Sequence, residues 1–139
     1  MHRPQNRTAA LLAAFGCALA YLPAGRALAA VCAALPLSAA GQSFALHCAA
    51  APLAEELMFR GAVQGLLRPL GPRAAVCVQA ALFAVQHGTP AGMAWALGCG
   101  LVLGALRERT GRVWPGMLLH TLNNCLLYTS PSPRDGATS

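Results

Sequence analysis

The stretch APLAEELMFRG, residues 51–61, places two adjacent glutamates and an arginine inside an otherwise apolar segment. Glu56 and Arg60 are four residues apart, so on a helix they share a face and can form an ion pair. Glu55 points about 100° away around the helix axis and is free to face elsewhere. Acidic residues are scarce in this chain, with four among 139 residues, so the segment concentrates half of them at one place.

The chain around this stretch is much more apolar than a soluble domain. Hydrophobic residues make up 56% of it and charged residues 10%, and its mean hydropathy is +0.51, whereas soluble domains carry about 25% charged residues. This composition predicts an integral membrane protein in contact with the lipid bilayer. Since each span needs about 20 residues, the length suits an all-α, polytopic transmembrane bundle of about five to six helices.

The charge pattern supports the same interpretation. All ten basic residues are arginines, and most lie in short segments between apolar runs, where membrane-flanking charges are found. No basic stripe with interleaved aromatic residues is present, so we expect no nucleic-acid partner.

Turn signals divide the chain into six predicted helices. They are expected over residues 8–25, bounded by Pro23 and Gly25, then over residues 27–40, from 42 onward, over 74–87, over 91–106, and from 113 onward. LLRPLGPR (residues 66–73) and RERTGR (residues 107–112) are predicted loops, the second at the membrane surface. Glu108 lies in that second loop, so Glu108→Gln is expected to do little.

Three polar elements fall on three different predicted helices. EELMFR carries the carboxylates, FAVQHG places His87 near a helix end, and HTLNN places His120 one turn from Asn123 and Asn124. These groups are of the kinds that activate a water molecule and stabilise an oxyanion. They could equally form a His/His/Glu metal site, a hydrogen-bonded cluster that joins helices, or a proton pathway. Arg60 would neutralise Glu56, and burial at membrane depth would leave Glu55 as the reactive carboxylate.

The motifs EELMFR, FAVQH and HTLNN, in this order, resemble the CAAX-protease and bacteriocin-processing family of intramembrane endopeptidases, also called the type II CAAX prenyl endopeptidase or abortive-infection family. RERTGRVWPGMLLHTLNN resembles the last motif region of that family. The resemblance covers about residues 45–124, whereas residues 1–44 match only in being apolar.

The resemblance implies hydrolysis of peptide bonds inside the membrane. By this resemblance, Glu55 and His87 would activate the water in this chain. The oxyanion would be bound by His120 and Asn124. Glu55 would be supported by Glu56 and Arg60. The family is often labelled metalloprotease, while a metal-free glutamate mechanism also fits. The cofactor is therefore left open, as Zn²⁺ or another divalent metal on Glu55, His87 and His120, or none.

The substrate and the setting are inferred from composition. Abundant alanine and arginine without lysine indicate a GC-rich bacterial genome, so we expect the bacterial plasma membrane and a peptide or membrane-protein substrate. The alternative is a non-enzymatic membrane scaffold or bacteriocin-immunity protein that keeps the fold.

The end of the chain changes character. CLLYTSPSPRD, residues 125–135, resembles the in-frame translation of a transposase-based sequencing adapter. We therefore expect three parts: N-terminal apolar helices at residues 1–44, a protease core at 45–124, and a non-native tail at 125–139. The natural C-terminus would then be missing, and N-terminal spans would be missing too.

Overall fold

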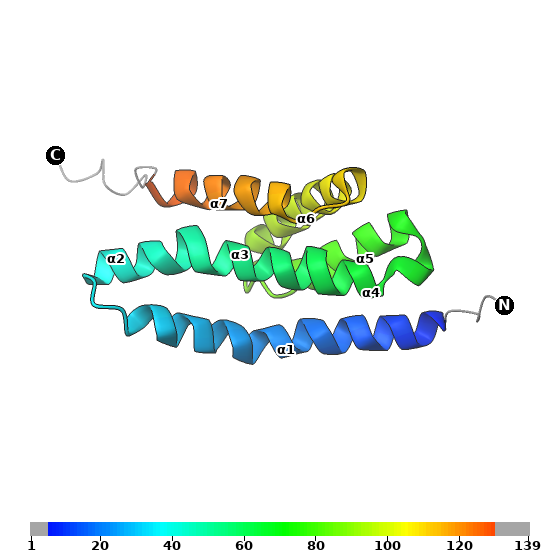
Figure 1. Ribbon diagram of the computed structural model, residues 1–139, viewed down its shortest axis with the longest axis horizontal. Coiled ribbons are helices and arrows are strands. Elements are labelled where there is room, and N and C mark those ends of the chain that lie inside the picture. Colours follow the sequence, from blue (N-terminus) through cyan, green and yellow to red (C-terminus); the bar gives the residue numbers. More distant parts are fainter. Residues whose placement is uncertain (1–5, 130–139) are drawn as a thin grey trace.

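The computed structural model describes residues 6–129, and within that range the chain is a bundle of five main helices without a β-strand (Figure 1). The all-α fold class is confirmed. The predicted tail extends past the described range, and its residues from 130 onward, like residues 1–5 at the other end, lie outside it.

The first helix, α1, spans Arg7–Ala33 and begins at Asn6, whose side-chain oxygen accepts from the backbone N–H groups of Thr8 and Ala9. The predicted break at Pro23 is wrong, because α1 runs through it. A proline removes one backbone hydrogen bond from a helix, and membrane helices tolerate this loss. Residues 8–33 are therefore one helix, about 40 Å long, instead of parts of two.

The opening motif lies in a long helix of residues 39–66. Its backbone stays right-handed helical across every junction. Two stretches have the wider π-helical hydrogen-bonding pattern. The segments are α2 (Ala39–Phe44), the π-helix η1 (Ala45–Ala50), α3 (Ala51–Glu55), the π-helix η2 (Glu56–Val63) and α4 (Gln64–Leu66).

Pro52 follows directly after the first π-helical stretch and its C-cap, Ala51. The N–H of Ala51 donates to the carbonyl of Leu46, five residues back. In this register the next bond would run from residue 52 to the carbonyl of His47, but Pro52 has no N–H to donate. The long helix therefore leaves the His47 carbonyl available to another partner.

The remaining helices follow after short connections. A 3₁₀ turn, η3 (Arg68–Leu70), leads to Gly71 at φ +93°, so the break predicted at LLRPLGPR is present, but only residues 67–71 lie outside the α-helices on either side. The other elements are α5 (Pro72–Ala84), α6 (Pro90–Thr110) and α7 (Trp114–Thr129). Figure 1 shows α1 and the long helix side by side, with α7 on the opposite side of the long helix.

The predicted RERTGR loop is wrong in its first four residues, because α6 continues to Thr110 and ends at Gly111, whose φ is +68°. Arg107 and Arg109 lie in its last turn, where cations interact favourably with the helix dipole. Glu108 is half-buried and accepts hydrogen bonds from Gln64 at 2.8 Å and Arg107 at 3.2 Å. Its carboxylate therefore has a structural role, and the expectation that Glu108→Gln would do little to the activity stays a prediction.

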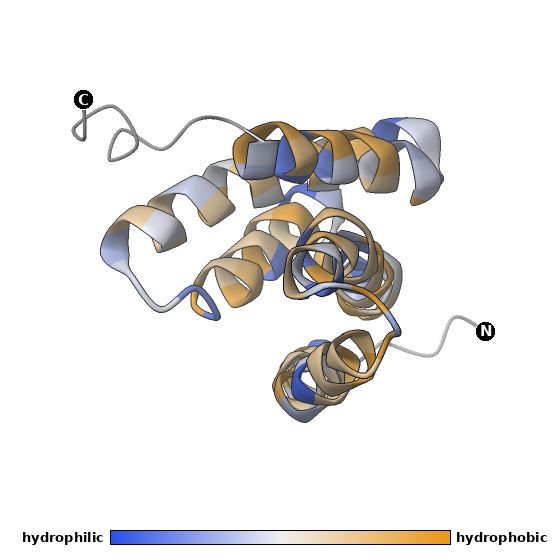
Figure 2. Ribbon diagram, turned by 90° about the vertical axis from the view of Figure 1, so that its left-hand side faces the viewer, coloured by the Kyte–Doolittle hydropathy of each residue, from blue (hydrophilic) through white to orange (hydrophobic). Residues whose placement is uncertain are grey.

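The bundle exposes many apolar side chains and buries several polar ones beside its hydrophobic core. Leucine, valine or phenylalanine side chains lie exposed on α1, the long helix, α6 and α7, whereas Glu56, Arg60, Gln64 and Gln79 are fully buried. Figure 2 shows that hydrophobic residues predominate along the helices. By length and composition, α1 and α6 can each cross a membrane. This distribution is the one expected of a bundle surrounded by lipid.

Candidate active site

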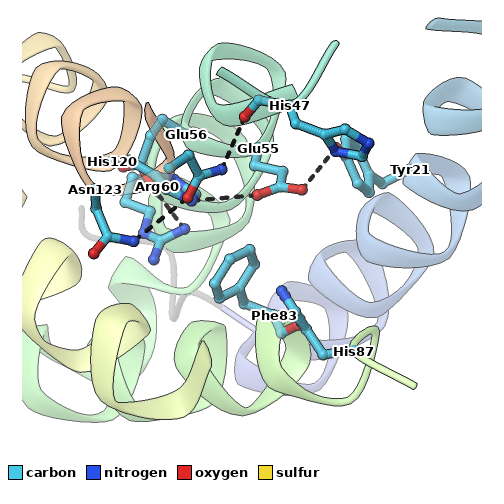
Figure 3. A network of polar contacts seen from close by, with 10 residues as sticks. Tyr21, His47, Glu55, Glu56, Arg60, Phe83, His87, His120 and Asn123 are labelled. Atoms are coloured by element: carbon cyan, nitrogen blue, oxygen red, sulfur yellow. Dashed lines mark hydrogen bonds and ion pairs between the residues drawn. The ribbon is translucent and has the colours of Figure 1, made fainter. Parts of the chain in front are cut away.

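Glu56 lies at the centre of a buried ionic cluster (Figure 3). Its Oε1 atom is 3.0 Å from Nη1 of Arg60, one turn further along the helix, so the ion pair expected from the spacing is present. The same oxygen is 3.0 Å from Nδ1 of His120 on α7. Both members of the ion pair are 0% exposed. A buried charge needs such partners, since an isolated one would be strongly destabilising.

Two further contacts fix this ion pair. The guanidinium of Arg60 lies over the ring of Phe83 on α5, 4.4 Å from its centroid. Gly116 on α7 provides space on the other side, because a Cβ atom there would lie 2.7 Å from Oε2 of Glu56. Residues of α5 and α7 therefore enclose the ion pair.

Glu55 faces a different environment from its neighbour. Its Oε1 atom accepts a hydrogen bond of 3.3 Å from the hydroxyl of Tyr21, and its Oε2 atom lies 3.6 Å from Nε2 of His120. Its side chain is 19% exposed. His120 thus stands between the two glutamates, and Glu55 is the one that a solvent molecule or a substrate can reach.

Two cavities meet at Glu55. The larger, about 450 Å³, lies against α1 and includes Tyr21 and Arg26 in its wall. The smaller, about 250 Å³, is lined on α7 by His120 and Asn124 and on α6 by residues that include Trp95 and Cys99. Glu55, Phe83 and His87 belong to both walls. An extended ligand that occupied both cavities would therefore pass directly over the Glu55 carboxylate.

His87 lies in the turn that follows α5. The helix predicted to reach it ends at Ala84, and the chain then bends. Its Nδ1 atom is 3.1 Å from the carbonyl oxygen of Phe83, so Nδ1 carries the proton and donates. The two rings meet edge to face with centroids 4.9 Å apart. These contacts fix the imidazole at the wall shared by the cavities and leave its Nε2 atom unprotonated in the neutral form.

Asn124 lines the smaller cavity, but its side-chain hydrogen bonds are made with His47 and Asn123. Its Nδ2 group donates to the His47 carbonyl at 3.1 Å, the acceptor that Pro52 leaves without a helical partner. Its side-chain oxygen accepts a longer bond of 3.4 Å from Asn123. One N–H of the Asn124 amide therefore attaches α7 to the long helix, and the second remains for a ligand.

The described residues contain no group of three or more His, Cys, Asp or Glu side chains arranged to hold a metal ion. His120 directs both ring nitrogens at glutamates, with Nδ1 on Glu56 and Nε2 facing Glu55. Glu55, His87 and His120, the metal ligands considered from the sequence, therefore do not form a metal centre in this arrangement.

The sequence did not indicate two groups that take part in the site, the Tyr21 hydroxyl and the His47 carbonyl. Tyr21 lies in a segment interpreted only as an apolar helix, although a tyrosine hydroxyl in such a helix needs a hydrogen-bond partner. The backbone carbonyl of His47 was not predictable from Pro52, because a proline in an α-helix frees the carbonyl four residues back, here that of Cys48, and the π-helical register moves the free acceptor to His47.

Fold and site together define a class. A helical bundle with apolar side chains on its exterior, and with a carboxylate and two histidines around internal cavities, is typical of a membrane protein with a polar site between its helices. A model of the type II CAAX prenyl endopeptidase Rce1-like family matches residues 36–126, and the chain belongs to this family of CAAX-type intramembrane proteases. Searches of curated proteins and of solved structures gave no match.

Proposed function

We propose that this chain is an intramembrane endopeptidase that hydrolyses peptide bonds with a water activated by Glu55 and His87. The observation that carries the proposal is the position of the Glu55 carboxylate, which forms part of the wall of both cavities while Glu56 beside it is sealed in an ion pair. A general base must be accessible to its water and held in one orientation, and of the two adjacent glutamates only Glu55 meets the first requirement.

The proposed reaction begins with a water between Glu55 and His87. Glu55 accepts the water proton as the oxygen attacks the carbonyl carbon of the scissile bond. When the C–N bond of the tetrahedral intermediate breaks, Glu55 returns this proton to the leaving amine. The products are a new carboxyl terminus and a new amino terminus, and the enzyme regains its starting state.

His120 and Asn124 would stabilise the oxyanion. The carboxylate of Glu56 accepts from Nδ1 of His120, so Nε2 becomes a donor when the ring is doubly protonated. Two carboxylates and one guanidinium leave the cluster with one negative charge, and a protonated His120 would make it neutral. Glu56 and Arg60 are then positioning residues, since they act through His120 and not on the substrate.

The proposed substrate is a peptide or a membrane-embedded protein segment that reaches the site from the bilayer. The cavity walls support this choice. The larger cavity combines mostly apolar side chains with Arg26 and Glu55, and the smaller one carries polar groups on α7. An extended peptide has the matching mixture of apolar side chains and backbone hydrogen-bonding groups.

The test compares protein and peptide termini in cells that carry the wild-type chain, Glu55→Gln or His87→Ala. We expect new termini with the wild type and a loss of about a hundredfold or more with either variant, because each removes a group that handles the water. Wild-type cleavage by either variant would sink the mechanism.

The matched control is Glu108→Gln, which makes the same chemical change in a separate polar cluster. It should lower stability, because Glu108 accepts two hydrogen bonds, yet leave cleavage per folded molecule unchanged. If wild type and Glu55→Gln give identical termini and the same phenotype, the chain acts as a membrane scaffold or immunity protein instead.

A further inference from the structure

Tyr21 reaches the proposed base from outside the matched region. It lies on α1, 34 residues before Glu55, whereas the family match begins at residue 36. Its hydroxyl donates to Oε1 of Glu55 at 3.3 Å, and its ring packs edge to face on Phe59 with centroids 5.6 Å apart. Figure 3 shows Tyr21 approaching Glu55 from the side opposite to His120.

These contacts make the two oxygens of Glu55 unequal. Oε1 is occupied by the Tyr21 hydroxyl, while Oε2 faces Nε2 of His120 across 3.6 Å. A carboxylate held at one oxygen loses rotational freedom, so the other oxygen stays in one place. We propose that Tyr21 is a positioning residue, which holds Glu55 so that Oε2 is the oxygen that takes the proton from water. This inference rests on the proposed function.

The ring and the hydroxyl of Tyr21 have separable tasks. The ring contacts Phe59, which is 0% exposed, and forms part of the wall of the larger cavity. It also lines an apolar hollow of about 420 Å³ between α1 and the long helix, together with Leu57 and Met58. The ring therefore packs α1 against the long helix. The hydroxyl donates its hydrogen bond to Glu55.

A tyrosine-to-phenylalanine substitution separates these tasks. In Tyr21→Phe the ring stays, so the melting temperature and KM for a cleaved peptide should stay within error and within twofold of wild type. The kcat should fall about tenfold, because one hydrogen bond to a charged group is lost. Tyr21→Ala should also lower the melting temperature and change KM, since the ring contact disappears with the hydroxyl.

The matched control is Tyr128→Phe on α7 in the same 139-residue chain. The Tyr128 hydroxyl also donates at 3.3 Å, to the carbonyl of Ala40, and its ring meets Phe44 edge to face at 5.8 Å. It is not among the residues that line the two cavities at Glu55. The control should keep the wild-type kcat.

The measured kcat values separate the role of Tyr21 from the proposed function. A wild-type kcat for Tyr21→Phe, with peptide still cleaved, overturns the role of Tyr21 and leaves the proposed function standing. Equal losses of kcat in Tyr21→Phe and Tyr128→Phe also overturn it, because any lost hydroxyl would then have the same effect. If the wild-type chain cleaves nothing, the proposed function fails first and this inference falls with it.

Discussion

The Oε1 atom of Glu56 lies 3.0 Å from Nδ1 of His120, and this contact joins the middle of the long helix to α7 across 64 residues of sequence. The same oxygen also holds Arg60. Because Glu56 fixes one nitrogen of the imidazole, the other is directed toward Glu55. The fully buried Glu56 therefore determines how His120 faces the partly buried Glu55.

Removing Glu56 alone should destabilise the chain strongly. Glu56→Leu leaves the Arg60 guanidinium buried without its carboxylate, which costs about 3–5 kcal/mol in comparable cases. The double variant Glu56→Leu/Arg60→Met should recover most of that stability, since no charge is then left unpaired. Thermal or denaturant unfolding in detergent measures both. Additive effects of the two substitutions would contradict the importance of the pair.

Gly116→Ala should disturb the cluster although it adds only a methyl group. Its Cβ would lie 2.7 Å from Oε2 of Glu56, so the carboxylate must move and His120 with it. We expect a loss of about 1–3 kcal/mol in stability and a fall in turnover. Gly98→Ala on α6 is the control, because its Cβ meets nothing within 4 Å and alanine favours helix. Equal behaviour of the two variants would exclude the steric explanation.

Asn124 and Pro52 should be coupled through the carbonyl of His47. Asn124→Asp removes the donor and should cost about 1–3 kcal/mol. In a Pro52→Ala background, the new N–H can donate to that carbonyl, so the same substitution should cost less. A double-mutant cycle on unfolding free energies gives the coupling. A coupling of zero would mean that the proline does not create the acceptor used by α7.

Chelation should leave activity intact. The described residues do not place three metal ligands together, and the proposed mechanism depends on protein groups alone. Cleavage should therefore survive 1,10-phenanthroline and dialysis against EDTA. Loss of activity that added Zn²⁺ restores would show that the side chains rearrange into a metal site that this conformation does not contain.

The sequence predicted the groups of the candidate site better than their connections. Spacing alone identified the Glu56–Arg60 pair, because a helix has a fixed period. The partner of His120 was not predictable, since it depends on how α7 packs on the long helix. The contribution of Tyr21 was missed for the same reason: nothing local to an apolar helix indicates which neighbour its hydroxyl will face.

Helix boundaries show where local signals fail. Gly71 marked a turn correctly, because its positive φ requires glycine. Pro23 and the arginines after Leu106 predicted breaks that do not occur. Proline is tolerated within apolar membrane helices, and arginines in the last turn of a helix interact favourably with its dipole. Each residue can therefore lie either inside a helix or at a break, and only the packing of the helices decides which.

The unused carbonyl at His47 also bears on how the protein is made. The long helix, with Glu55, Glu56 and Arg60, leaves the ribosome before α7, so the growing chain carries its ion pair but neither His120 nor Asn124. The His47 carbonyl gives the incoming α7 a fixed place to dock. Docking brings His120 between the two glutamates in the same movement. The proposed site therefore stays incomplete until the last described helix is in place.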